Sequence, residues 1–455
     1  MSPETRRTAG LLTIGLGSSV GPLDTAVNVA FPRITADFGE PMAMIQWVVI
    51  CYVLTYASLM LVFGKLGDMF GYRRIFVAGL VLSIGALALC ALAPSFGWLL
   101  FFRGLQGLGT ALVLSCGPAL ATAGFDEDRR ARVLGAYTMM YAIASAVGPT
   151  VGGVLVEHLG WQGVYWFRVP IAALALALMG FVPKAAPPPA SGRFDALGAV
   201  LVVASLVAML LALNMARAGG GLWLGALAVI GFAAFVWQER RSPAPLIKLT
   251  PFRSPEFCLV NLASIAVYLV NFAVLLLVPY YLDRLTGLPV TWAGIVLAAG
   301  YGGAVVAAPL GGRLAPALGS GRVGFAGAAL VAVGTIIIGL WQADTPLWLM
   351  LVGLLVSGVG LGFFQVAYMD VVIGQLPRAD RGVAGSLTTL TRTIGIVSGV
   401  TILTLTFELL RGGYTADGLV PDASFLAAFQ ATFLWAGGAL AAFLALSLLR
   451  PRTWL

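Results

Sequence analysis

Three charged side chains lie inside long apolar runs of this sequence, where each is costly to keep. Asp24 belongs to the stretch LDTAVNVAFP at the end of the first run, and Arg103 and Arg168 lie a few residues inside two later runs. A charge at the bilayer centre costs about 3 kcal/mol on insertion scales, so such groups face the interior of a helix bundle and pair with one another. With a rise of about 1.5 Å per residue, all three lie roughly 6 to 10 Å below one membrane surface. The spacing therefore predicts a buried Asp/Arg cluster.

This cluster could serve either of two purposes. A buried carboxylate beside an arginine can bind a proton in one conformation and release it in another, which would make Asp24 and Arg103 proton-coupling residues. The alternative is a purely structural ion pair. Arg168 could be a second partner of Asp24, or it could favour an anionic cargo. In later runs, either Asp370 pairs with Arg392 near an inner gate, as a further proton-coupling residue, or Asp370 is an ordinary interface residue.

Polar and aromatic side chains within the runs are candidates for lining a substrate cavity. One helical stripe, with members three to four residues apart, consists of Asn261, Ser264, Tyr268 and Asn271. The other candidates are Asn28, Tyr52, Tyr56, Tyr137, Tyr141, Gln365 and Tyr368. Such a lining would suit an amphipathic organic cargo, whereas hydrogen bonds between helices explain any single residue equally well.

The elements that must position these side chains are membrane helices. The 455 residues are 60% hydrophobic and only 10% charged, with a mean hydropathy of +0.95, whereas ordinary domains carry about 25% charged residues. Apolar runs of about 20 residues predict spanning helices rather than the roughly 10-residue strands of a barrel. We expect an all-α membrane protein with fourteen transmembrane helices, at residues 9–31, 44–63, 75–93, 98–121, 133–156, 164–182, 197–216, 222–237, 257–282, 292–310, 323–341, 347–373, 383–410 and 429–449.

The basic residues between the spans indicate their orientation. If both termini are cytoplasmic, the positive-inside rule is satisfied by all of these residues except Arg33, Arg217, Arg284 and Arg411. We therefore expect a multi-pass protein of the cytoplasmic (inner) membrane, in contact with the lipid bilayer. The net charge of +8 is scattered among loops rather than gathered in one patch, so we expect no nucleic-acid partner.

Other kinds of chemistry have little support in the sequence. The four cysteines lack metal-ligand spacing, so we expect free thiols, no metal and no cofactor. A single histidine, His158, argues against an intramembrane enzyme. The sequence has no GxxxxGK[ST] loop for ATP-driven transport.

The chain also divides into two similar halves. Two Pro-rich basic stretches, PKAAPPPASGRFD and QERRSPAPLIKLTPFRSPEF, bracket the seventh and eighth spans. We expect an N-terminal six-helix bundle at 1–183, a linker with two additional transmembrane helices at 184–255, and a C-terminal six-helix bundle at 256–455. Gly107 and Gly109 recur 251 positions later as Gly358 and Gly360, which favours a duplicated transporter architecture.

Two glycine-rich motifs are candidates for a conformational gate. GKLGDMFGYRR begins at Gly64 and is a tight basic turn, and ASAVGPTVGG has small residues spaced for close helix packing plus a bending proline. A plain basic loop and a plain packed helix are the simpler interpretations. The candidate gate residues are Gly64, Asp68, Gly71, Arg73, Arg74, Gly148, Pro149 and Gly152.

These motifs resemble signatures of the major facilitator superfamily. GKLGDMFGYRR is similar to its loop G-x-L-x-D-x-x-G-R/K-R/K, in which the acid, here Asp68, helps to latch the two halves. FFRGLQGLGTA resembles its fourth-span signature, and ASAVGPTVGG resembles its antiporter signature G-x-x-x-G-P-x-x-G-G. LDTAVNVAFP resembles the first-span signature of the fourteen-span drug:proton antiporters. GWQGVYWFRVP resembles their sixth-span signature, with Arg168 where Asn is usual.

The resemblance implies the major facilitator fold, with two six-helix bundles plus two extra helices. It also implies a transporter rather than an enzyme. We expect a proton-coupled antiporter that exports small organic compounds or drugs by alternating access. Its partners would be this substrate and protons, and it would function as a monomer. The alternative is an exporter or permease for one specific metabolite or lipid.

Overall fold

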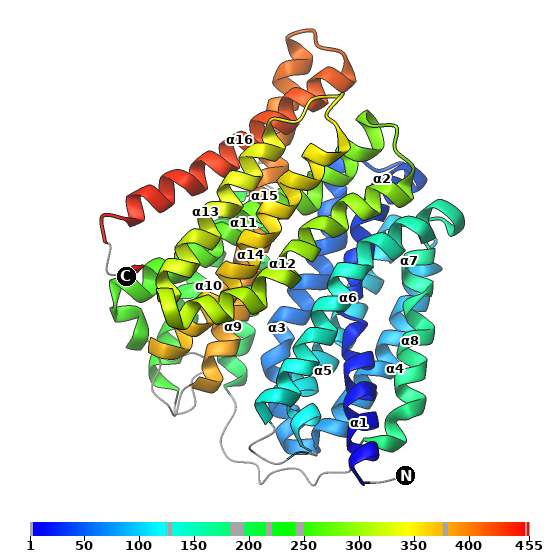
Figure 1. Ribbon diagram of the computed structural model, residues 1–455, viewed down its shortest axis with the longest axis vertical. Coiled ribbons are helices and arrows are strands. Elements are labelled where there is room, and N and C mark those ends of the chain that lie inside the picture. Colours follow the sequence, from blue (N-terminus) through cyan, green and yellow to red (C-terminus); the bar gives the residue numbers. More distant parts are fainter. Residues whose placement is uncertain are drawn as a thin grey trace. The chain divides into compact units, whose positions relative to one another are not determined.

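The computed structural model describes residues 3–123, 125, 130–182, 195–214, 221–242, 250–375, 381–450 and 453–454, and within these ranges all regular structure is helical (Figure 1). The chain divides into two compact units, Met1–Ala199 and Val200–Leu455. The structure thus agrees with the expected all-helical class.

The first unit is built around α5, which packs against α3 and α4, while α6 packs against α2 and the short helix η1. Its elements are α1 (Pro3–Ser19), η1 (Pro22–Thr25), α2 (Ala26–Phe38), η2 (Met42–Ile45), α3 (Gln46–Phe70), α4 (Tyr72–Ala91), α5 (Phe96–Thr122), α6 (Arg130–Leu159), α7 (Gly163–Trp166), α8 (Arg168–Ala177) and η4 (Leu178–Phe181).

The first predicted span, residues 9–31, is wrong as a single helix. It is broken after Ser19, passes through the 3-10 turn η1, and continues as α2. Pro22 explains the break, because it has no N–H to donate and its ring clashes with the carbonyl of the preceding helical turn. Asp24 therefore lies in the break, where its backbone N–H donates to the Gly21 carbonyl at 3.0 Å.

The sixth predicted span, residues 164–182, is interrupted as well. It consists of α7, α8 and η4, with Phe167 between the first two. Arg168 is consequently the first residue of α8. In α8, Pro170 lies in the first turn, where a missing N–H is tolerated.

In the second unit α14 packs against α12 and α13, and α11 packs against α15. The elements are α9 (Ala196–Asn214, which begins in the first unit), α10 (Gly221–Arg241), η6 (Thr250–Arg253), α11 (Pro255–Leu285), α12 (Val290–Leu318), α13 (Ser320–Gly339), α14 (Leu347–Gln375), α15 (Arg381–Ala416) and α16 (Pro421–Ser447). Helix α16 begins earlier than the predicted residue 429, because Pro421 is well suited to the first helical turn.

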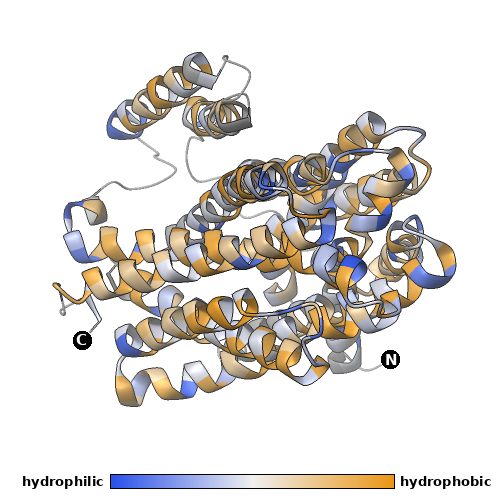
Figure 2. Ribbon diagram, turned by 90° about the horizontal axis from the view of Figure 1, so that it is seen from above, coloured by the Kyte–Doolittle hydropathy of each residue, from blue (hydrophilic) through white to orange (hydrophobic). Residues whose placement is uncertain are grey.

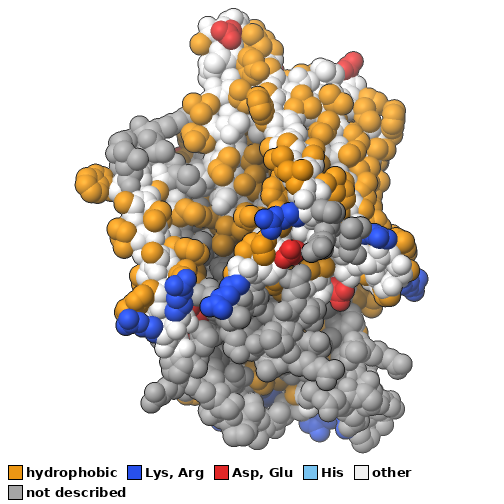
Figure 3. All heavy atoms as spheres, turned by 90° about the vertical axis from the view of Figure 1, so that its left-hand side faces the viewer, with side chains coloured by type: hydrophobic (Ala, Val, Ile, Leu, Met, Phe, Trp, Pro, Cys, Tyr) orange, Lys and Arg blue, Asp and Glu red, His pale blue; other side chains and the backbone are white. Residues whose placement is uncertain are grey.

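Eleven helices among the described residues are long and apolar enough to cross a membrane. Apolar residues predominate along the helices of both units (Figure 2). Hydrophobic side chains also cover much of the described part of the face in Figure 3. Large side chains such as Trp223, Trp348 and Trp435 are exposed, as expected for surfaces that face lipid. Helices coincide with the other predicted spans too, and the count of fourteen crossings remains a prediction.

The repeated glycines occupy equivalent packing positions in the two units. A Cβ atom on Gly107 would lie 2.6 Å from the Tyr52 carbonyl oxygen on α3, and one on Gly109 would lie 2.9 Å from a backbone nitrogen of α4. In the second unit, a Cβ atom on Gly358 would contact the backbone of Gly300 on α12, and one on Gly360 would contact the backbone of α13. The sequence repeat is therefore also a repeat of helix contacts.

Replacement of Gly107 by alanine should force α3 and α5 apart. Overpacking of this kind costs about 1–3 kcal/mol, so we expect a lower melting temperature for Gly107→Ala in detergent. Gly104→Ala, one turn earlier on α5, is the matched control, because its Cβ would meet nothing closer than 3.9 Å. Equal melting temperatures for the two variants would contradict the close α3–α5 contact.

Candidate functional site

The structure brings Asp24, Arg103 and Arg168 into one ion-pair cluster, so the predicted contact among them is confirmed. Arg103 donates through Nη1 to Asp24 Oδ1 at 2.7 Å and through Nη2 to Oδ2 at 2.8 Å. Arg168 Nη1 donates to the same Oδ1 at 2.7 Å. The bidentate geometry of the first pair combines charge attraction with directional hydrogen bonds.

Three separate elements hold these side chains in place. Asp24 comes from the η1 break, Arg103 from α5 and Arg168 from the start of α8. Each arginine is also fixed through Nε, because Arg103 donates to the Val48 carbonyl at 2.8 Å and Arg168 donates to the Val164 carbonyl at 3.0 Å. The cluster therefore ties α5 and α8 to the break in the first span.

Gln106 completes the hydrogen bonding and was missing from the predicted site residues. Its Nε2 donates to Asp24 Oδ1 at 3.0 Å, and its Oε1 accepts from Arg103 Nη1 at 2.8 Å. Its position three residues after Arg103, on the same helical face, is the feature of the sequence that could have indicated this role.

The cluster is almost completely enclosed. The side chain of Arg103 is 1% exposed and that of Arg168 is 0% exposed, whereas that of Asp24 is 14% exposed. The guanidinium carbon of Arg103 lies 4.4 Å from the centre of the Tyr52 ring, and that of Arg168 lies 5.4 Å from the centre of the Tyr165 ring. Of the three charged side chains, that of Asp24 is therefore the one that remains partly accessible at the protein surface.

Of the cavity candidates in the first unit, Tyr52 lies in the cluster itself, and its hydroxyl donates to the Gly21 carbonyl at 3.3 Å. Tyr56 is its ring neighbour, with centroids 5.2 Å apart. Asn28 is buried on α2. Tyr137 is buried on α6 with its hydroxyl against Gly117, and Tyr141 on the same helix is half-buried.

In the second unit the polar candidates form a neutral hydrogen-bond network. The Tyr368 hydroxyl on α14 donates to Asn261 Oδ1 on α11 at 2.8 Å and lies 2.8 Å from Thr391 Oγ1 on α15. Ser264 Oγ also reaches Thr391, at 3.4 Å. Asn261 and Tyr368 are buried, which favours hydrogen bonding between helices over cavity lining for both residues. Thr391 was not among the predicted site residues.

Two other polar candidates of the second unit are less enclosed. Asn271 is half-buried on α11 and Gln365 is exposed on α14. The Tyr268 ring of α11 is buried, and the guanidinium carbon of Arg392 lies 5.5 Å from its centre.

The Asp370–Arg392 pair, one of two alternatives from the sequence, is not formed. Asp370 is exposed near the end of α14, where its carboxylate accepts a hydrogen bond from the Ser320 hydroxyl at the start of α13. Arg392 lies instead over the Tyr268 ring of α11. This arrangement favours the interpretation of Asp370 as an interface residue.

The gate candidates fall into two groups. In the first, Gly71 joins α3 to α4 with a φ of 92°, a conformation that favours glycine. Arg73 Nη2 donates to the Met179 carbonyl of η4 at 2.9 Å, and Arg74 is exposed. Gly64 lies on α3 with free space around it. The side chain of Asp68 lies outside the described residues.

The second group connects α6 to the Asp24 break. A Cβ atom on Gly152 would lie 2.7 Å from the Ala26 carbonyl oxygen, and Gly148 lies against the Thr25 side chain. Pro149 is inside α6 between these two contacts. The Thr25 hydroxyl donates to the Ser145 carbonyl of α6 at 3.0 Å. The small residues of ASAVGPTVGG thus allow α6 to pack directly on the residues that follow Asp24.

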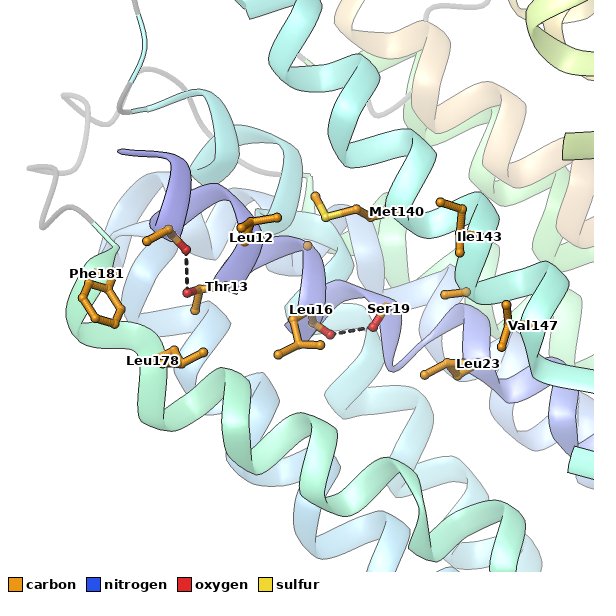
Figure 4. A pocket seen from close by; sticks show the side chains of 13 residues that line it. Leu12, Thr13, Leu16, Ser19, Leu23, Met140, Ile143, Val147, Leu178 and Phe181 are labelled. Carbon is orange, nitrogen blue, oxygen red and sulfur yellow. Dashed lines mark hydrogen bonds between the residues drawn. The ribbon is translucent and has the colours of Figure 1, made fainter. Parts of the chain in front are cut away.

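An apolar groove of about 550 Å³ runs along α1, between α6 and η4 (Figure 4). Its lining includes Leu12, Leu16, Met140, Ile143 and Phe181, and it reaches Leu23, the neighbour of Asp24. The two lining hydroxyls, of Thr13 and Ser19, donate to carbonyls of their own helix at 2.8 and 2.7 Å. The groove therefore presents an apolar surface of a size typical of small-molecule sites.

A multi-pass helical bundle with a buried ion-pair cluster and repeated glycine contacts is typical of a membrane transport protein. The model of the Major Facilitator Superfamily matches residues 10–400. The chain therefore belongs to the major facilitator superfamily of transporters.

Relatives of known name are similar over most of the chain. The riboflavin transporter RibZ of Clostridioides difficile is 30% identical, over 86% of this chain and 86% of its own length. The multidrug resistance protein Stp of Mycobacterium tuberculosis is 31% identical, over 86% of this chain and 74% of its own length. The tetracenomycin C resistance and export protein of Streptomyces glaucescens is 30% identical over the same shares.

Solved structures share the fold at low sequence identity. An auto-inhibited POT family peptide transporter superposes with a TM-score of 0.72 at 16% identity and covers 96% of both chains. A bacterial homologue of the human lysosomal transporter Spinster, inward-facing and occupied, has a TM-score of 0.72 at 17% identity, over 100% of this chain and 98% of its own. These likenesses describe the fold alone.

Arg103→Lys should destabilise the protein even though it keeps the charge. A lysine has no planar fork, so it cannot donate to both Asp24 oxygens and to the Val48 carbonyl. Loss of one or two charged hydrogen bonds costs about 2–3 kcal/mol, which should lower the melting temperature in detergent. The exposed Arg33 of α2 provides the control Arg33→Lys. An unchanged melting temperature for Arg103→Lys would count against the bidentate pair.

Proposed function

We propose that this transporter is a proton-coupled exporter of small organic compounds or drugs, of the fourteen-span antiporter group. It would act as a monomer in the cytoplasmic membrane, with both termini inside. The observation that carries the proposal is the Asp24 carboxylate, held in a helix break by two buried arginines and still 14% exposed. This carboxylate is partly accessible at the protein surface and has ion-pair partners on two other helices. Binding and release of a proton by such a group can be coupled to movement of those helices.

The coupling step follows from the charges of the cluster. Ionised Asp24 accepts hydrogen bonds from both arginines and holds α5 and α8 to the break. Protonation removes the negative charge, so two buried guanidinium groups lose their counter-charge and the bonds weaken. Because α6 packs on Thr25 and Ala26, movement of the break is passed to α6. Release of the proton on the other side of the membrane restores the ion pairs.

The cargo could be a range of drugs or one specific metabolite. The apolar groove along α1 suits an apolar or amphipathic compound. Relatives named for multidrug or antibiotic resistance support drug export, whereas the relative named as a riboflavin transporter supports the single-metabolite alternative. Asp68 and its loop would form the cytoplasmic latch.

The test of coupling is transport in proteoliposomes under an imposed pH gradient. Riboflavin and tetracenomycin C are suitable first probes, because relatives are named for them. We expect gradient-driven transport by the wild type, and its loss in Asp24→Asn, which cannot exchange a proton. Asp417→Asn, at an exposed position, should behave like the wild type. Full coupling in Asp24→Asn, or wild-type transport that ignores the gradient, would overturn the mechanism.

A drug-sensitivity panel separates the two cargo classes. If the protein exports many compounds, cells that lack it should become several-fold more sensitive to structurally unrelated antibiotics, and expression of the gene should restore resistance. A change in riboflavin export without any change across the panel would favour the single-metabolite alternative.

A further inference from the structure

The buried cluster carries one positive charge more than its contacts neutralise. It contains two guanidinium groups and one carboxylate, and within the described ranges neither arginine forms an ion pair with a second acid. A net charge enclosed in the protein interior is unfavourable, because water no longer solvates it. The Asp24 carboxylate cannot supply the missing charge, since its single negative charge offsets only one of the two guanidinium groups.

The imbalance is localised at Arg168. All three nitrogens of the Arg103 guanidinium donate, to Val48, Gln106 and both oxygens of Asp24. Arg168 uses Nε and Nη1, whereas its Nη2 is buried without a hydrogen-bond partner. Native proteins rarely leave a charged donor in this condition.

A second orphaned donor belongs to the residue whose ring the Arg168 guanidinium faces. The hydroxyl of Tyr165 is also buried without a partner, and its ring is the one that faces the Arg168 guanidinium. Both side chains are 0% exposed. Tyr165 is three residues before Arg168, so the two side chains project from the same side of the α7–α8 segment. One guanidinium nitrogen and one hydroxyl, both without acceptors, are complementary to an anion.

We propose that a monovalent anion, a halide or a carboxylate, binds at Arg168 Nη2 and the Tyr165 hydroxyl and brings the cluster to zero net charge. Both donor atoms are enclosed in the present conformation, so the anion enters when the region around Asp24 opens. A halide would be a resident counter-ion. A carboxylate would belong to the cargo, and this version rests on the proposed export function and assigns that function an anionic substrate class.

The test is a melting-temperature titration of the full-length protein in detergent, in a low-salt HEPES buffer without a pH gradient. Sodium chloride and sodium benzoate are the two probes. We expect a saturable rise of about 2 °C on binding. The rise should be lost in Arg168→Gln and retained in Arg33→Gln, which removes an exposed charge from the same unit.

Tyr165→Phe is the milder variant, because it removes only the hydroxyl. It should raise the half-saturating concentration about fivefold, the effect of one lost hydrogen bond. This variant keeps the inference testable if Arg168→Gln does not fold.

The outcomes separate the sources of the anion. A saturable response to chloride but not to benzoate identifies an inorganic counter-ion, and a response to benzoate identifies a carboxylate site. No saturable response in the wild type, or an equal response in Arg168→Gln and Tyr165→Phe, means a general salt effect only and overturns the inference. Since no proton gradient is applied, failure here is distinct from failure of proton coupling.

Discussion

The ion pairs between Asp24 and its two arginines are the interaction on which the first unit depends. They join the η1 break, α5 and α8 at one point, with hydrogen-bond distances of 2.7 to 2.8 Å. In an interior that excludes water, removal of the Asp24 carboxylate leaves two buried guanidinium groups without a counter-charge, which is strongly destabilising. The break in the first span, which interrupts backbone hydrogen bonding, is therefore retained by side-chain contacts made to it.

Close packing of α6 also stabilises the break in the first span. Gly148 and Gly152 of α6 allow contact with Thr25 and Ala26, directly after Asp24. The second unit has a comparable arrangement, in which Gly395 and Gly399 of α15 lie within 2.7 and 2.6 Å of carbonyl oxygens of α11, measured from an added Cβ. There, however, α11 is continuous from Pro255 to Leu285, and its buried hydrogen bond between Asn261 and Tyr368 is neutral.

The two units thus share a packing scheme and differ in charge. The first unit contains a broken helix with a buried ion-pair cluster, and the second contains an unbroken helix with the Asn261–Tyr368–Thr391 network. The proposed proton coupling would act in the first unit, because a change of one proton alters the balance of three buried charges. The hydrogen bonds of the second unit keep α11, α14 and α15 together without a comparable change of charge.

The sequence by itself determined the membrane class, the approximate positions of the helices and the contact among Asp24, Arg103 and Arg168, because apolar run length and depth along a helix follow from residue order. Only the tertiary structure decided how these elements turn toward one another. It placed Gln106 and Thr391 at polar sites, separated Asp370 from Arg392, and left one nitrogen of Arg168 without an acceptor. The physical reason is that the rotation of each helix, and the break at Pro22, depend on packing against helices far away in the sequence.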